Sequence, residues 1–300
     1  KDFGELLDLT FRLCKNHFSG FFMILLIVLG PIYIFEAILL SFAGTGFFQE
    51  MSPADAIFGQ FRSNLAGNES FQSSFNFGLA GIGSLIVGMA TLVLLPVTRS
   101  GVLIAVHQIK DNQDFTAGSV IKRSFSKFWP ILGCSLLFGI IVFGMSFVGV
   151  ISPTIIGAVL SATINSVLGI GVGILLFIGV AIVAALLITR WSLFLGSVVI
   201  DNDAPGLTRS WHLTTNRTWK TLGFFIVVFI ITSIIGGAVG GITGFLLGGS
   251  VLSTIINDLV SLLTSMIFSV AYAVIYFDMK IRHDGDDLKD MIEDYEGTGQ

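Results

Sequence analysis

The sequence PGLTRSWHLTTNRTWKTLG, residues 205–223, is polar, basic and aromatic, and it leads directly into a long apolar run. Written as a helix, it places Leu207, Trp211, Thr215 and Trp219 on one stripe at intervals of four. Its basic side chains then lie on other faces, an arrangement typical of a helix resting on a membrane surface. The stretch therefore predicts an interfacial helix followed by a membrane span.

The same pattern occurs twice earlier in the chain. Residues 117–133 carry Ile121, Phe125 and Trp129 on one face, and residues 3–18 carry Phe3, Leu7, Phe11, Cys14 and Phe18. Basic residues lie beside both stripes, and two apolar runs follow each. We interpret this as three repeats of an interfacial helix plus two spans, at about 3–108, 115–203 and 204–282. Together with a tail at 283–300, they are expected to form a single membrane domain over residues 1–300.

The composition excludes a water-soluble globular protein. Hydrophobic residues make up 53% of the 300 residues and charged residues only 12%, which leaves too little polar surface to cover a globule of this size. The net charge is −4, and charged residues of both signs lie in short segments between the apolar runs, with no basic patch. We therefore expect membrane lipids as partners, with other membrane proteins as a further possibility, and no nucleic acid.

Six stretches reach the roughly 20 apolar residues that a membrane-spanning helix needs. They are Phe18–Phe42, Phe77–Val97, Trp129–Ile151, Val167–Ile188, Trp219–Gly248 and Leu252–Phe277. These runs are continuous and do not alternate as the strands of a membrane barrel would. The predicted fold class is an all-α, polytopic membrane protein with six transmembrane helices.

The distribution of basic residues predicts the orientation in the membrane. Of the 16 Lys and Arg residues, only Arg62 lies in an odd-numbered connection, so both termini are predicted to be cytoplasmic. The four Trp residues lie on the same predicted side, where indole rings favour the interface. Cys14 and Cys134 also lie there, and the reducing environment makes a disulfide unexpected.

The first outer connection, about residues 43–76, is the only long one. Ser52 and Pro53 form a good helix start, and an apolar face follows, so we expect a short helix on the outer leaflet or over the bundle mouth. The triplet at residues 68–70 fits a glycosylation sequon, but such triplets arise often by chance.

The fifth span is rich in glycine. Small residues four apart allow helix backbones to approach closely, so a tight helix contact is the preferred interpretation and a flexible or hydrated pathway the alternative. Because glycine weakens a helix, this span could also be irregular. The glycines concerned are Gly236, Gly237, Gly240, Gly241, Gly244 and Gly248.

Four ionisable residues in or beside the spans need a reason, because charges in a bilayer are costly. Glu36 lies in the outer half of the first span, and Asp258 lies near the outer start of the sixth, where Asn257 and the helix dipole could support it. Arg99 and Arg190 close the second and fourth spans in matching contexts. Both arginines could simply reach the inner headgroups, or they could hold a lipid phosphate between repeats.

No catalytic or metal-binding motif is present in the sequence. The four His residues are scattered near the cytoplasmic face, and the glycine runs lie inside apolar spans rather than in a phosphate-binding loop. The acidic residues at 284–287 lack the other positions of a calcium loop, so a solvated turn is the preferred interpretation. We expect no cofactor, no metal and no enzymatic activity.

The C-terminal end carries a more specific signature, Tyr276-Phe-Asp-Met-Lys-Ile-Arg-His-Asp-Gly-Asp-Asp-Leu288. It resembles the signature of the membrane domain family named after bacterial glycerophosphoryl diester phosphodiesterases, and residues 3–8 and 208–219 are also similar to that family. The resemblance implies a multi-helix domain of the bacterial plasma membrane. The chain has no segment long enough for a catalytic barrel, so the enzymatic name does not carry over. Asp278 is expected to pair with an interfacial Arg, and Lys280 and Arg282 to anchor the last helix to anionic headgroups.

Three functions remain open at this point. The preferred one is a non-enzymatic membrane protein that binds lipid or serves as the membrane subunit of a larger assembly. A transporter or exporter conferring resistance to a membrane-active compound is the first alternative, because repeats and buried charges suit it. An intramembrane lipid-modifying enzyme is the second, and it would require polar groups converging at one depth.

Overall fold

The structure, a computed structural model, describes residues 3–48, 79–201, 203, 205–215 and 217–297, and every regular element in them is an α-helix. Six of the helices are long and apolar enough to cross a membrane. The candidate spans are Phe18–Phe42, Gly83–Lys110, Phe128–Thr163, Ser166–Ile200, Thr218–Leu247 and Val251–His283. The chain is an all-α polytopic membrane protein, as the sequence predicts. The short outer helix expected around Ser52 lies outside the described residues.

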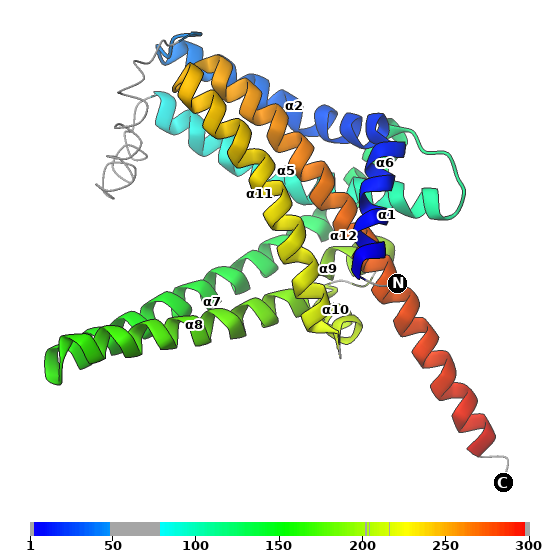
Figure 1. Cartoon of the computed structure of the whole chain (residues 1–300). Coiled ribbons are helices and arrows are strands. Elements are labelled where there is room, and N and C mark those ends of the chain that lie inside the picture. The colour runs from blue at the N-terminus through cyan, green and yellow to red at the C-terminus, as the bar shows by residue number, and fades with distance from the viewer. Residues whose placement is uncertain (1–2, 49–78, 202, 204, 216, 298–300) are drawn as a thin grey trace. The chain divides into compact units, whose positions relative to one another are not determined.

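A short helix followed by two long ones occurs three times along the chain (Figure 1). The first set is α1 (Phe3–Asn16), α2 (Phe18–Phe42) and α5 (Leu79–Lys110), and the second is α6 (Ala117–Ser126), α7 (Phe128–Thr163) and α8 (Ser166–Trp191). After α9 (Phe194–Ile200), the third set is α10 (Leu207–Thr214), α11 (Thr218–Leu247) and α12 (Val251–Gly297). This order agrees with the predicted unit, and the repeat itself stays a prediction.

The predicted interfacial helices are shorter than expected. The helix predicted from residue 205 to 223 is broken, because α10 ends at Thr214 and Thr215 has extended backbone angles, with φ −57° and ψ 137°. The Thr214 and Thr215 hydroxyls donate to the carbonyls of Ser210 and Trp211, and such bonds compete with helix continuation. The stripe from Leu207 therefore stops before Trp219. The other two copies are also shorter than predicted. Helix α1 ends at Asn16 and α6 ends at Ser126, and a single residue separates each from the next helix.

Three predicted span boundaries also need correction. Helix α5 does not end near Val97 but runs to Lys110, because the apolar residues 102–106 continue it and are buried. Helix α7 extends to Thr163, with Pro153 inside it. Helix α12 runs to Gly297, so residues 284–287 are helical rather than a turn.

The described chain forms two compact units. One comprises Gly4–Ser126 and Val227–Ala271, and we call it the carboxylate unit, because it contains Glu36 and Asp258. The other comprises Lys1–Phe3, Lys127–Ile226 and Tyr272–Gln300, and we call it the hairpin unit, after its long α7–α8 pair.

In the carboxylate unit, α2, α5 and α6 pack against one another. The side chains of Phe21, Ile24 and Leu103 are fully buried there. Phe115, from the loop before α6, stacks on Phe21 with ring centroids 5.7 Å apart, and Gly20 leaves room for its ring. Helix α2 coincides with the predicted first span, Phe18–Phe42.

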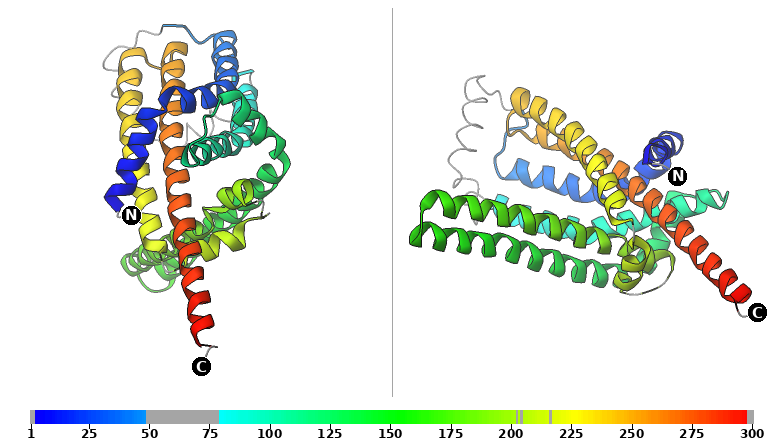
Figure 2. Two further views of the ribbon diagram at one scale, coloured as in Figure 1. Left: turned by 90° about the vertical axis from the view of Figure 1, so that its right-hand side faces the viewer. Right: turned by 60° about the horizontal axis from the view of Figure 1, so that its bottom comes forward.

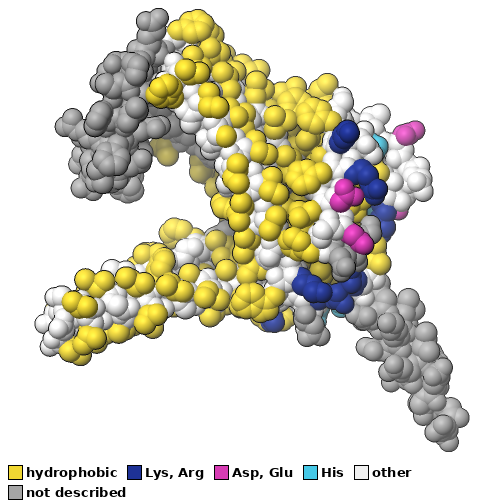
Figure 3. Space-filling view, in the orientation of Figure 1, with side chains coloured by type: hydrophobic (Ala, Val, Ile, Leu, Met, Phe, Trp, Pro, Cys, Tyr) yellow, Lys and Arg dark blue, Asp and Glu magenta, His cyan; other side chains and the backbone are white. Residues whose placement is uncertain are grey.

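In the hairpin unit, α7 and α8 lie side by side in every view (Figures 1 and 2). Two residues join them, and the side chain of Asn165 caps α8 by accepting the N–H of Val167 at 2.9 Å. Hydrophobic side chains follow the visible face of the hairpin along its length (Figure 3). Such a surface suits hydrocarbon. At 36 residues, α7 is about 54 Å long, which exceeds the roughly 30 Å hydrocarbon thickness of a bilayer.

Candidate functional site

The C-terminal end of α8 is held by hydroxyl groups from α10. The backbone carbonyl of Arg190 accepts a hydrogen bond from Ser210 Oγ at 2.7 Å, and the Thr214 hydroxyl, shared with the Ser210 carbonyl, lies 3.3 Å away. Ser210 Oγ also accepts the N–H of Leu193 at 3.1 Å. Both hydroxyl residues are fully buried. The last carbonyls of a helix lack partners within the helix, so these bonds fix the position of α10 against α8.

Two residues later in the chain, Trp211 and Thr218, hold the guanidinium of Arg190 in position. Its Cζ lies 4.4 Å from the centroid of the Trp211 ring, a cation–π distance, and its Nε donates to Thr218 Oγ1 at 3.3 Å. The Trp191 and Trp211 rings lie 5.8 Å apart. The negative end of the α8 dipole also favours a cation at this point.

Arg190 lines a cavity of about 380 Å³ between α8 and the start of α11. The α8 side of this cavity consists of Val183, Leu186 and Leu187, which share one face of the helix with Arg190. Thr218 and the 68% exposed Trp219 form the other side. We call this the Arg190 cavity. It combines one cationic, hydrogen-bonding end with an aliphatic wall.

Arg99 does not occupy an equivalent position. It lies inside α5, which continues to Lys110, whereas α8 ends one residue after Arg190. Neither arginine closes its candidate span, because these spans continue to Lys110 and Ile200, but Arg190 does lie at the end of helix α8. Like Arg190, Arg99 lies over an aromatic ring, with its Cζ 5.0 Å from the centroid of Phe268.

The structure brings the two predicted outer carboxylates together in the carboxylate unit. Glu36 and Asp258 lie close enough for their charges to interact with each other and with Tyr33. Tyr33 and Asp258 line a groove of about 370 Å³ between α2 and α12, which we call the Asp258 groove. The backbone N–H groups of Val251 and Leu252 bind the carbonyls of Gly46 and Phe47, and Phe47 also lines the groove.

The predicted support for Asp258 needs correction. Asn257 donates instead to Thr243 Oγ1 at 3.1 Å and to the Ser253 carbonyl at 2.8 Å. Asp258 is also seven residues past Val251, where α12 begins, and the helix dipole acts mainly within the first turn. Asp258 Oδ2 is buried and accepts no hydrogen bond from the part of the chain that the structure describes.

A second polar cluster lies in the hairpin unit, around Asp201 at the end of α9. Asp201 Oδ2 accepts the Tyr276 hydroxyl at 2.6 Å and lies 2.8 Å from Nε of Arg209, and Oδ1 pairs with Lys280. Burial by itself would raise the pKa of this carboxyl. The hydrogen bonds from Lys280 and Tyr276, together with the charges of Lys280 and Arg209, outweigh burial and hold the pKa of Asp201 below its ordinary value. We call these four residues the Asp201 cluster.

The Asp201 cluster gives the C-terminal signature a structural role. Tyr272, Tyr276 and Lys280 recur every four residues along α12, and all three reach the α9 segment, Tyr272 by accepting the N–H of Gly196 at 3.2 Å. An added Cβ at Gly196 would overlap the Tyr276 ring, so only glycine allows this approach. Lys280 was expected to anchor to headgroups, but it binds a protein carboxylate.

The other prediction for the signature is confirmed in part. Asp278 pairs with Arg282 at 2.8 Å, one helical turn away, so its partner is an Arg as expected. This pairing gives Arg282 a carboxylate partner within α12, and its expected headgroup contact stays a prediction.

The predicted glycine contact in the fifth span is absent at three positions. Among the described residues, an added Cβ at Gly236, Gly237 or Gly241 would meet no atom within 4 Å, and at Gly240 it would meet Asn257 Oδ1 at 3.4 Å, an ordinary contact. The span is also a continuous helix, not a broken one, and ends at Leu247 before Gly248, which has a φ of 56°. The contact predicted for Gly244 stays a prediction.

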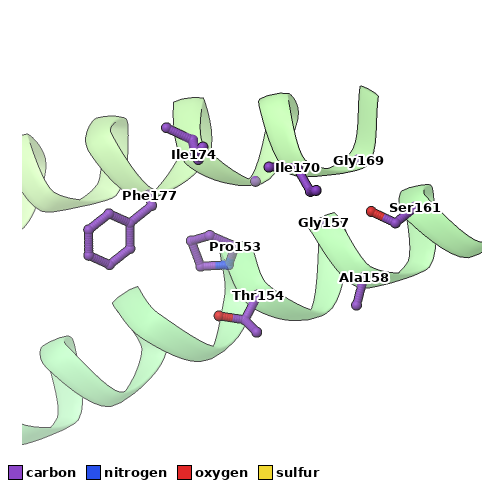
Figure 4. Close-up of a pocket in the computed structure, with 10 residues that line it drawn as sticks. Pro153, Thr154, Gly157, Ala158, Ser161, Gly169, Ile170, Ile174 and Phe177 are labelled. Atoms are coloured by element: carbon purple, nitrogen blue, oxygen red, sulfur yellow. The ribbon is translucent and has the colours of Figure 1, made fainter. Parts of the chain in front are cut away.

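The close glycine contact occurs instead near the tip of the α7–α8 hairpin. A Cβ at Gly157 would lie 3.2 Å from the Cα of Gly173, and one at Gly169 would overlap Ser161. Figure 4 shows Gly157 and Ser161 on one helix facing Gly169 on the other. These residues, with Pro153 and Phe177 among others, line a further apolar hollow.

Sequence reasoning missed the residues that build the two sites in the hairpin unit. Ser210, Thr214 and Thr218 are spaced by four, and this stripe of hydroxyls was a readable signal on a predicted interfacial helix. Asp201 belongs to no motif and is, in the sequence, simply an acidic residue that follows a span. Nothing in the sequence pairs it with residues 75 to 79 positions later.

Other reactive groups in the described residues are sparse. Cys14 and Cys134 are both free and buried, and burial raises the pKa of the Cys14 thiol to about 12, which keeps it protonated. Within the described part of the chain, no three His, Cys, Asp or Glu side chains form a group that could hold a metal ion.

Comparison of the chain with protein-family models, with curated proteins and with solved structures finds no match.

Proposed function

We propose that this integral membrane protein binds an anionic phospholipid in the Arg190 cavity and catalyses no reaction on it. The phosphate would contact the Arg190 guanidinium, and an acyl chain would lie along Val183, Leu186 and Leu187. The observation that carries the proposal is the position of Arg190, a cation fixed by Trp211 and Thr218 at one end of an aliphatic wall.

The chemistry of this cavity suits a lipid better than a water-soluble anion. A guanidinium can donate two parallel hydrogen bonds to a phosphate, which gives geometry as well as charge. The aliphatic wall can pack against an acyl chain through van der Waals contacts, a contribution that inorganic phosphate cannot make. The exposed Trp219 beside the cavity favours a position at the membrane interface.

The predicted orientation supports the same proposal. The distribution of Lys and Arg predicts that the end of α8 lies at the inner face of a bacterial plasma membrane. Anionic lipids are attracted to basic residues at that face. Both termini would then be cytoplasmic.

Native mass spectrometry of the protein, extracted in mild detergent from its own host, tests the proposal. We expect a retained anionic phospholipid, and we expect Arg190→Gln to weaken its affinity about tenfold, so that retention falls towards a tenth of the wild-type amount when the site is far from saturated. Lys220→Gln, an exposed cation in the same helix as Trp219, removes the same charge and should retain the lipid.

Two outcomes would refute the proposal. The first is equal lipid retention by the wild type and Arg190→Gln. The second is equal competition for the site by inorganic phosphate and phosphatidylglycerol, which would show that the aliphatic wall contributes nothing. Arg99→Gln serves as a further comparison, because Arg99 has an aromatic partner in a different unit.

A further inference from the structure

The Asp258 groove combines an apolar wall with negative charge, and it lies in the carboxylate unit, apart from the residues of the Arg190 cavity. The apolar wall consists of side chains from two helices, namely Leu26, Ile34, Ile38, Ile255, Leu259 and Leu262. Its volume of about 370 Å³ lies within the range of pockets that hold small organic molecules.

Charge determines which molecules this groove can accept. Asp258 lines the groove and Glu36 lies within electrostatic reach of it, while no Lys or Arg side chain is among the residues that line the groove. The buried Oδ2 of Asp258 accepts no hydrogen bond within the described chain, so a donor or a positive charge would satisfy it. A carboxylate in an apolar setting needs a positive partner to compensate for its lost hydration, and the second carboxylate nearby adds attraction, so the groove favours a cation over an anion.

From this geometry we propose that the Asp258 groove binds an amphipathic organic cation. Its positive group would lie at Asp258, with Glu36 adding attraction, and its hydrocarbon body would lie against the aliphatic side chains of α2 and α12. This binding does not depend on the Arg190 cavity, and it concerns ligands of the opposite charge.

Equilibrium dialysis of the full chain in phosphatidylcholine nanodiscs tests the proposal, with tetraphenylphosphonium as the probe and empty nanodiscs as the baseline. Tetraphenylborate has a similar shape and the opposite charge, so it separates charge recognition from apolar partition. We expect saturable binding of tetraphenylphosphonium that tetraphenylborate does not share.

Two variants with different effects locate the binding. Asp258→Asn removes the charge and should weaken binding of tetraphenylphosphonium by at least about tenfold. Ala37→Phe keeps both carboxylates but fills the groove that Ala37 lines, and it should reduce binding by a similar factor. Asp114→Asn removes an exposed carboxylate of the same unit and should leave binding unchanged.

The proposal fails if tetraphenylborate binds as well as tetraphenylphosphonium does, or if neither Asp258→Asn nor Ala37→Phe weakens binding. Thermal unfolding of each variant checks that it is folded. If Asp258→Asn does not fold, Ala37→Phe and the pair of oppositely charged probes still decide the question. Lipid retention by Arg190 is a separate measurement and can fail or succeed independently.

Discussion

Tyr276 donates its hydroxyl to Asp201 Oδ2 across 2.6 Å, although 75 positions separate the two residues in the sequence. Lys280 binds the other carboxylate oxygen, so residues one turn apart on α12 both reach the end of α9. The carboxylate is 8% exposed and carries the opposite charge to its two cationic neighbours. The Asp201 cluster therefore connects distant segments of the hairpin unit.

Replacing Asp201 with Asn should destabilise the protein by about 2 kcal/mol. The change leaves Lys280 and Arg209 near each other without a shared anion. The expected loss of stability is smaller than that for a fully buried ion pair, because both cations are partly exposed. Thermal unfolding in detergent measures the effect. Asp203→Asn, two positions away and exposed, is the matched control, and an equal loss in the two variants would contradict the role of the cluster.

The contribution of Asp201 should depend on pH. Its folded pKa lies below the ordinary value, so its stabilisation is fully present above the pKa of about 3.9 for an unfolded Asp and is lost as the pH falls through the folded pKa. The difference in melting temperature between the wild type and Asp201→Asn should stay constant from pH 7 to about pH 5. It should then shrink on further acidification, and a difference that grows on acidification would have the wrong sign.

Gly196→Ala should destabilise the hairpin unit by about 2 kcal/mol, because the new methyl group overlaps the ring of Tyr276 and nearby rings and backbone must shift. Gly179→Ala in α8 is the control, since a Cβ there meets no atom within 4 Å. The control should be neutral or stabilising by up to about 1 kcal/mol, as expected for Ala replacing Gly in a helix. Chemical unfolding followed by far-ultraviolet circular dichroism compares the two, and identical midpoints would exclude the contact.

Gly169→Ala should loosen the tip of the α7–α8 hairpin, where the added methyl group overlaps Ser161. We expect a loss of about 2 kcal/mol, or faster proteolysis near residues 161–169. Gly237→Ala in α11 should be tolerated, because a methyl group there meets no neighbouring atom. If Gly237→Ala were the less stable of the two variants, the close glycine contact would lie in the glycine-rich span α11 and not at the hairpin tip.

Ser210→Ala should impair the Arg190 cavity without changing any charge. The hydroxyl holds both the Arg190 carbonyl and the Leu193 N–H, and its loss should cost about 1 kcal/mol, or more where the buried groups stay unpaired. Lipid retention should fall together with stability. Thr208→Ala removes an exposed hydroxyl of α10 and should change neither quantity.

The sequence was sufficient to predict the elements and insufficient to predict their contacts. Runs of about 20 apolar residues must be helical in a bilayer, so the six spans followed from composition alone, with Phe18–Phe42 at its observed bounds. The break after Thr214 was missed because it depends on threonine hydroxyls that compete with the backbone. The partner of Arg190, Trp211, lies on the predicted interfacial helix that follows the fourth span in the sequence. The partners of Asp201 depend on tertiary packing that no local pattern encodes.

The connection between α9 and the end of α12 also has a consequence for synthesis of the protein. Translation delivers Asp201 before Tyr276 and Lys280, so a nascent chain holds this carboxylate near the membrane with its final partners still unmade. Insertion of the last span supplies them. A chain that stops before residue 276 would therefore lack two of the three partners of Asp201 and would hold α9 less firmly.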